Sequence, residues 1–153
     1  MRIFVLDTSI VVHYLRQSHL YAKIEADNQL TSADAAPVIS SVTKGELLSF
    51  AQQRGWGENK MQSLNIFLQN ITAVDVKATD NDLQLAYAKI DAYSKNKTFD
   101  VNGSFLNGSA RVMGKNDLWI AATAFVLSAP LLTVDGDFDH LNNTFFKVIK
   151  YLP

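Results

Sequence analysis

Four acidic residues, spread over most of the chain, stand where a parallel sheet places its chemistry. Asp7 follows the apolar run 3–6, and Asp135 follows the mostly apolar run 131–134. Both runs have the composition of short buried strands. Because side chains just beyond the carboxyl ends of parallel strands face a shared crevice, we expect these two carboxylates to lie close together. Carboxylate oxygens are the ligands that Mg²⁺ prefers, so the sequence predicts a divalent-metal site.

Two further acids stand near the start of predicted helices. Asp117 precedes the run 118–127, which is apolar on nearly all sides and is typical of a buried helix. Glu46 lies in the first turns of a helix that we expect after the strand-like residues 37–40. If all four acids meet in one crevice, each carboxylate raises the pKa of the others. The metal-free site is therefore expected to destabilise the fold.

Each acid also has an ordinary structural interpretation. Asp7 and Asp117 are both placed to cap the helix that follows them. Residues 43–46 fit a capping box, and residues 135–139 fit a solvated turn. Four unrelated caps and turns are much less probable at these four positions together than any one of them alone, so the combined pattern favours the metal site.

The last acidic turn contains three aspartates, so the identity of the fourth site acid stays open. Asp135 directly follows the predicted strand and is the first choice. Asp137 is the second choice, and Asp139 fits an exposed turn position.

Composition and charge narrow the class of protein. At 153 residues and 48% hydrophobic content, the chain is expected to form one globular domain over residues 1–153. A net charge of −1 excludes a simple polybasic nucleic-acid binder, and the absence of cysteine excludes disulfides and thiolate zinc sites. The uncharged stretch 118–134 contains Pro130 and divides better into a helix, a turn and a strand than into a membrane span. We expect a soluble, cytoplasmic protein.

Strand-like and helix-like segments alternate along the chain, which favours an α/β fold with a mostly parallel sheet. A long stretch rich in Gly, Asn and Ser, residues 97–114, is expected to be a loop. The expected strands are 3–6, 38–39, 71–76, 131–134 and 146–151, and the expected helices are 9–16, 42–54, 58–69, 80–95 and 117–127.

Four short segments, in order and spread over nearly the whole chain, resemble the PIN-domain ribonucleases. The most similar members are the VapC-type toxins of bacterial toxin–antitoxin pairs. The helix start Asn-Asp-x-x-Ile-Ala-Ala-x-Ala is the most specific of these segments. They are Val5–Ser9, Ser41–Leu47, Lys115–Ala124 and Leu132–Phe138.

The resemblance implies a PIN-like three-layer sandwich, with a central sheet flanked by helices, that hydrolyses RNA phosphodiester bonds. It implies an acidic cluster that binds Mg²⁺ or Mn²⁺ and that Thr8 or Ser9 supports. It also implies a cognate antitoxin and a homodimer as partners. The implied catalytic residues are Asp7, Glu46, Asp117 and Asp135. Because these acids gather at the ends of elements, we expect Asp7, Asp117 and Asp135 to be the metal ligands and Glu46 to position a metal-bound water or act as a base.

The sequence also permits other hypotheses about function. A PIN domain without catalytic activity, acting as a protein-binding module, is the main alternative. A haloacid-dehalogenase-like phosphatase needs a second aspartate where Ser9 stands. A basic rim for an RNA backbone, together with Phe99 and Phe105 as stacking platforms, is a weaker hypothesis. Its lysines and arginine are Lys44, Lys95, Lys97, Arg111 and Lys115.

Overall fold

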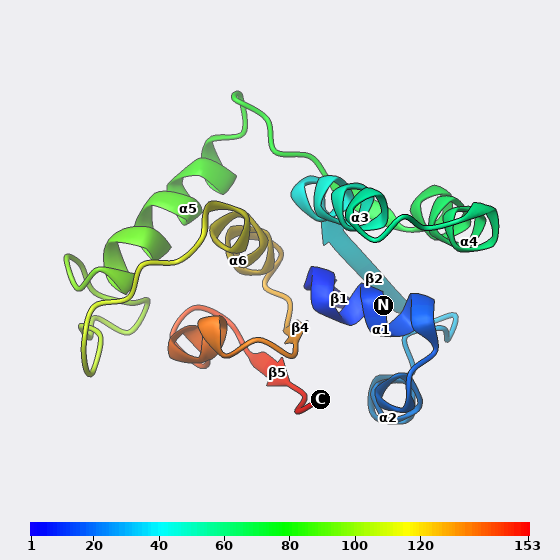
Figure 1. Ribbon diagram of the computed structural model, residues 1–153. Coiled ribbons are helices and arrows are strands. Elements are labelled where there is room, and N and C mark those ends of the chain that lie inside the picture. The colour runs from blue at the N-terminus through cyan, green and yellow to red at the C-terminus, as the bar shows by residue number, and fades with distance from the viewer.

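A five-stranded sheet runs through the computed structural model, which describes residues 1–153 (Figure 1). All strand pairs are parallel, and the strand order is β3-β2-β1-β4-β5. This arrangement confirms the predicted α/β class. The strands are β1 (Arg2–Leu6), β2 (Ala35–Ser40), β3 (Thr72–Val74), β4 (Leu131–Thr133) and β5 (Val148–Lys150).

Helices cover both faces of the sheet, so the fold has three layers (Figure 1). Side chains alternate along a strand, and accordingly Phe4 and Leu6 belong to one hydrophobic core while Val5 belongs to the other. No helix combines the length and hydropathy that crossing a bilayer requires. The helices are α1 (Thr8–Arg16), α2 (His19–Asn28), α3 (Ser41–Gln53), α4 (Glu58–Asn70), α5 (Asn81–Ser94), α6 (Lys115–Leu127) and a 3₁₀ helix, η1 (Gly136–Leu141).

On one face of the sheet, the hydrophobic core packs helices α1, α2, α3 and α4 together through residues such as Ile10, Ile24, Leu47 and Leu64, all fully buried. The core on the second face joins α5, α6 and η1. Burial of this apolar surface at roughly 25 cal/mol per Å² is the main force that holds the helices against the strands. The two cores together fix the strand ends from which the acids project.

Two helices of the structure were not predicted. Helix α2 has an N-cap, Ser18, that makes no side-chain capping hydrogen bond. The C-cap residues of α1 and α2 are Gln17 and Gln29, which take left-handed backbone angles (φ 48° and 51°) where glycine is the usual signal. The other missed helix, η1, is a short 3₁₀ element that the acidic turn conceals in the sequence.

The predicted loop 97–114 contains neither helix nor strand in the structure. Its first turn is organised by Asp100, a buried carboxylate that accepts backbone N–H bonds from Asn102 (2.8 Å) and Ser104 (3.0 Å). Phe99 and Phe105 are exposed, and their ring centroids lie 6.3 Å apart. Asp100 therefore has a structural role within the loop.

Candidate metal centre

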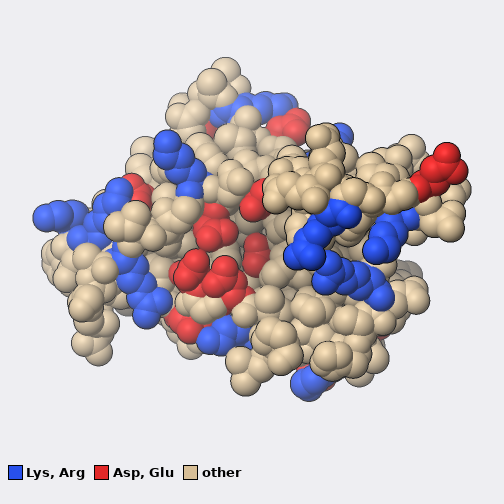
Figure 2. Space-filling view, viewed as in Figure 1, with Lys and Arg blue, Asp and Glu red and all other residues tan.

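The predicted acids come from four elements that end or begin at the same edge of the sheet. Asp7 follows β1, and Asp135 lies two residues beyond the end of β4, the strand that pairs with β1. Glu46 lies on α3, which starts where β2 ends, and Asp117 lies in the first turn of α6. Figure 2 shows acidic side chains gathered near the centre of one face, with lysines and arginines on both flanks.

Three of the carboxylates lie close enough to share a cation. One oxygen from each of Asp117, Asp135 and Asp137 lies within 4.8 Å of the others. Oxygens bound to Mg²⁺ at about 2.1 Å stand about 4.2 Å apart on opposite sides of the ion, so small side-chain rotations close the remaining difference. The donor set consists of hard oxygens and fits Mg²⁺ or Mn²⁺. Asp137, the second choice from sequence, is thus present beside Asp135, the first.

Asp7 lies outside this group of three, and its oxygens are occupied by hydrogen bonds. Its Oδ1 accepts the backbone N–H of Thr8 at 2.8 Å, which caps α1. Its Oδ2 accepts the hydroxyls of Ser9 (2.8 Å) and Thr133 (2.7 Å). The helix-cap interpretation of Asp7 is therefore confirmed, and the carboxylate is 6% exposed beside the cluster. Direct metal binding by Asp7 stays a prediction.

Glu46 does not form the predicted capping box. The N-cap of α3 is Ser40, whose Oγ accepts the backbone N–H of Val42 at 3.3 Å. Glu46 Oε1 instead accepts the hydroxyl of Thr8 at 2.8 Å. The side chain is half-buried and faces the loop that carries Asp7.

Negative charge and burial act together on this cluster. Burial, followed by the charges of Asp7, Asp135, Glu46 and Asp137, raises the pKa of Asp117 to about 7. Burial also raises the pKa of Asp7, against the lowering effect of the hydrogen bonds from Thr133 and Ser9. A carboxyl that resists ionisation in this way is stabilised in its charged form by a cation. The electrostatics therefore match the expected destabilisation of the metal-free site.

The comparisons with known proteins identify the family. The PIN domain family model matches residues 4–143. The chain belongs to the PIN domain family. PIN domains are generally nucleases, and PIN nucleases generally use divalent metals. A comparison with curated protein sequences found no significant match.

Solved structures of similar fold come from bacterial toxin–antitoxin complexes. A chain of VapBC2 from Rickettsia felis, crystallised with a promoter DNA fragment, has 22% identity and a TM-score of 0.73 over 97% of this chain and 98% of that chain. A chain of VapBC-1 from nontypeable Haemophilus influenzae has 23% identity and a TM-score of 0.68, with 97% of each chain covered. VapBC-5 from Mycobacterium tuberculosis gives 21% identity and a TM-score of 0.64 over 99% of this chain and 100% of that chain. At these identities the likeness confirms the PIN fold.

A groove of about 500 Å³ leads away from the PIN domain's acids between α1 and α3. It begins beside Asp117, at Asn116, and passes Thr8 and Glu46 toward Phe50 and Gln53. Its lining combines hydroxyl, amide and aromatic side chains, which suits a polar, extended ligand.

One residue of the site was missed by sequence reasoning. Thr133 reaches Asp7 from β4, but a threonine inside a short strand carries no signal of its own. His13 contacts Ser18 (2.7 Å), His140 contacts Ser94 (2.7 Å), and no histidine belongs to the acidic group.

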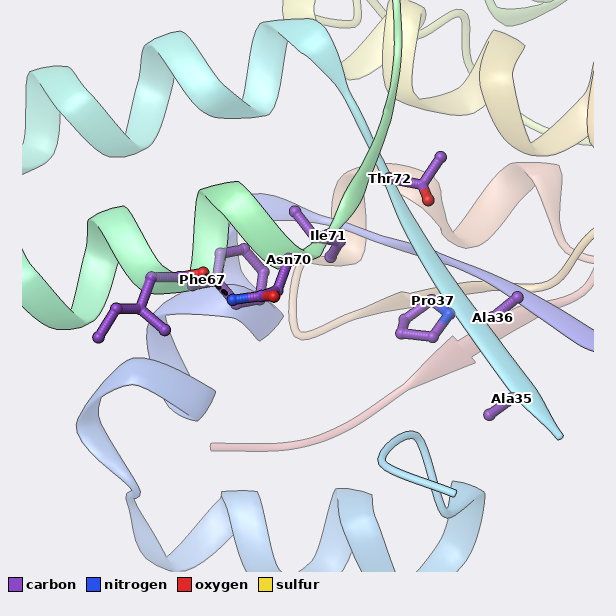
Figure 3. A pocket seen from close by; sticks show the side chains of 8 residues that line it. Ala35, Ala36, Pro37, Phe67, Asn70, Ile71 and Thr72 are labelled. Carbon is purple, nitrogen blue, oxygen red and sulfur yellow. Dashed lines mark hydrogen bonds between the residues drawn. The ribbon is translucent and has the colours of Figure 1, made fainter. Parts of the chain in front are cut away.

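A second pocket, of about 420 Å³, lies at the opposite edge of the sheet and offers no alternative centre (Figure 3). It is formed by the N-terminal half of β2 and the end of α4, and it contains no titratable side chain. Its lining residues are Ala35, Ala36, Pro37, Ile66, Phe67, Asn70, Ile71 and Thr72.

Proposed function

We propose that this PIN domain is a divalent-metal-dependent endoribonuclease and the toxin of a VapBC-type toxin–antitoxin pair. The observation that carries the proposal is the convergence of Asp117, Asp135 and Asp137, with one oxygen of each within 4.8 Å of the others. The raised pKa of Asp117 supports it, because a cation would stabilise the charged carboxylate there.

In this proposal Asp117 and Asp135 hold Mg²⁺ or Mn²⁺, and either Asp7 or Asp137 completes the ligand set. The ion supplies Lewis-acid chemistry, which offsets negative charge on the phosphodiester as it is cleaved. Glu46 lies at the mouth of the groove, where its carboxylate is placed to orient the attacking water and accept its proton. Hydrogen bonds from Thr133 and Ser9 hold Asp7 in place, and Asp7 in turn fixes the start of α1 relative to the acidic cluster.

The substrate and partners are also part of the proposal. RNA fits as the substrate because cationic side chains flank the acidic centre and can attract the phosphates of its backbone. The similar chains come from VapBC complexes, which supports a cognate antitoxin as partner. Leu85 and Val126, which are 68% and 41% exposed near one another on α5 and α6, support a homodimer. We place the protein in the cytoplasm, the compartment of its RNA substrate.

The test is cleavage of total RNA by the purified protein with Mn²⁺ or with EDTA. We expect cleavage only with the metal, and a loss of at least ~100-fold in Asp117→Asn and Asp135→Asn, because removing one electrostatic stabiliser of a transition state typically costs this much. Asp82→Asn, an exposed acid on α5, is the control with the same charge change and should retain activity. Cleavage that resists EDTA, or full activity in Asp117→Asn, would refute the proposal. Manganese binding without any cleavage would instead favour the catalytically inactive, protein-binding PIN domain.

A further inference from the structure

A group of cationic and aromatic side chains lies at the far end of the groove. Arg16 ends α1 and Arg54 follows α3, yet both guanidinium carbons lie near the same Phe50 ring, at 5.5 and 5.1 Å from its centroid. Trp56 meets Phe50 edge-on at 5.7 Å, and Lys60 Nζ lies 5.9 Å from the Trp56 centroid. We call these five residues the basic–aromatic patch.

None of the three cations of the patch forms an ion pair, although Glu58 lines the same pocket as Arg54 and Lys60. The ion pairs of the molecule involve four other cations, Arg2, Lys23, Lys95 and Lys150. Arg16, Arg54 and Lys60 are exposed, and their contacts are with aromatic rings. An aromatic ring restrains a guanidinium without cancelling its charge. The patch therefore presents free positive charge on partly ordered side chains, which is what a chain of phosphates binds.

The patch is continuous with the metal centre. Phe50 lines the groove that also contains Glu46. Glu46, Phe50 and Arg54 are spaced by four residues, so they follow one face of α3. At ~1.5 Å per residue, Glu46 and Arg54 lie about 12 Å apart along the helix. Figure 2 shows a group of basic side chains beside the central acids, over the region of α1, α3 and α4 in Figure 1.

The charge distribution explains why such a patch is needed. The chain carries a net charge of −1, and the candidate centre is itself strongly acidic, so both repel a polyanion. Of the predicted rim, Lys95 is paired with Asp91 at 3.0 Å, whereas Lys44, Lys97, Arg111 and Lys115 form no ion pair. The loop aromatics Phe99 and Phe105 pack edge-on against each other. The patch adds three further unpaired cations, two of which, Arg16 and Arg54, lie over Phe50, the ring that lines the groove.

We propose that the basic–aromatic patch binds the backbone of single-stranded RNA that leads away from the phosphate held at the acidic centre. The proposal rests on the proposed function and deepens it by naming the substrate as unpaired RNA. Unpaired bases stack on guanidinium planes and on aromatic rings such as Trp56, whereas a rigid duplex presents only its phosphates. At ~3.4 Å per nucleotide of a stacked strand, the distance from Glu46 to Arg54 corresponds to about three phosphates.

The test compares two double variants with the same change in charge. Arg16→Gln/Arg54→Gln removes the patch, and Lys89→Gln/Lys147→Gln is the control. Lys89 also lies over an aromatic ring, at 5.1 Å from the Phe99 centroid, and neither Lys89 nor Lys147 lines the groove. Binding of a short fluorescein-labelled unpaired RNA is followed by anisotropy in EDTA, over a range of KCl concentrations.

We expect the patch variant to bind at least ~10-fold more weakly than wild type. The slope of its log Kd plotted against log KCl concentration should fall by about 1.4, because the variant loses two phosphate contacts and each contact to a single strand contributes about 0.7 to that slope. The control should stay within about two-fold of wild type, and Arg54→Gln alone should give an intermediate loss. Thermal melting checks that all variants fold.

Equal affinity and salt dependence in the two double variants would overturn the patch, as would stronger binding of an RNA duplex than of the unpaired strand. Cleavage by wild type in Mn²⁺ is measured in parallel, so the two proposals fail separately. Cleavage with an unaltered Arg16→Gln/Arg54→Gln affinity removes only the patch. Patch-dependent binding without cleavage removes the nuclease activity.

Discussion

Thr133 Oγ1 donates a 2.7 Å hydrogen bond to Asp7 Oδ2, across 126 residues of sequence. The same hydroxyl accepts the backbone N–H of Asp135 at 2.9 Å. The contact is possible because β1 and β4 pair in parallel, with Leu6 opposite Leu132. One buried threonine therefore sets the relative positions of two acids from neighbouring strands.

Thr133→Val should weaken both stability and activity. The variant keeps the shape of the side chain but leaves a buried carboxylate oxygen and an amide without this partner, which costs about 1–3 kcal/mol of unfolding free energy. Residues that orient metal ligands typically change affinity or activity by about 10- to 100-fold, and RNA cleavage in Mn²⁺ should fall within that range.

The matched control for this variant is Thr123→Val. Thr123 is also fully buried, and its hydroxyl donates to the Trp119 carbonyl within α6 at 2.8 Å. It should lose some stability and keep its cleavage rate. If both valine variants cleave RNA equally well, Thr133 has no positioning role.

Asp117→Asn should stabilise the metal-free protein at neutral pH. The folded pKa of Asp117 is about 7, against an ordinary value of 3.8. Between these values the folded state holds a proton that the unfolded state has lost, so stability falls as the pH rises from about 4 to about 7. Melting in EDTA should show Asp117→Asn gaining on wild type from pH 5 to pH 8.

Adding Mn²⁺ at pH 8 should reverse the order, because the ion binds the folded state of wild type. Asp82→Asn should follow wild type in both conditions. A wild-type melting temperature that is flat between pH 5 and pH 8 in EDTA, with no response to Mn²⁺, would contradict the metal centre.

Much of the fold could be predicted because the strands at the centre of the sheet are largely buried; β4 is buried at every residue. Runs such as 131–134 are apolar except for Thr133, and each predicted strand is present. The helices with an apolar face or a polar cap were also predicted; Asp80, for example, caps α5 by accepting the Leu83 N–H at 3.0 Å. Helix α2 has weaker signals: Ser18 makes no capping hydrogen bond, and the buried apolar side chains of its face are only Leu20 and Ile24, so tertiary packing maintains it.

The candidate site was predictable only in part. Acids at strand ends mark the edge of the sheet, but which oxygens converge depends on turns of a few residues. The 3₁₀ turn of η1 brings Asp137 back beside Asp135, whereas Asp139 pairs with Lys150 at 2.8 Å. Contacts such as Thr133 with Asp7, or Arg16 with Phe50, join segments that are far apart in sequence, so the sequence alone does not predict them.

Asp135→Asn should reduce activity more than Asp137→Asn. Asp135 is half-buried, its backbone is held by Thr133, and its Oδ1 accepts the Asp137 N–H at 2.9 Å. Asp137 is exposed, so water can replace one of its oxygens around a cation that keeps several waters. Cleavage assays over a Mn²⁺ titration should give a loss of at least ~100-fold for Asp135→Asn. Asp137→Asn should be rescued by more metal, and the opposite order would assign Asp137 as the principal ligand.

His140 should set the acid limit of stability. Burial, together with the charge of Arg111, lowers the pKa of His140 to about 4 from an ordinary 6.5, although Asp139 acts in the opposite direction. Between these values the unfolded state binds a proton that the folded state does not, so the stabilisation is complete above about pH 6.5 and is lost as the pH falls toward 4. The ring stacks on Tyr93, its Nε2 contacts Ser94 Oγ, and its buried Nδ1 has no partner to share an added proton.

His140→Gln should flatten the fall in unfolding free energy between pH 6.5 and pH 4, measured by urea titration. The control is His19→Gln, at an exposed histidine, whose fall in unfolding free energy should run parallel to that of wild type. An unchanged slope in His140→Gln would place the acid sensitivity elsewhere.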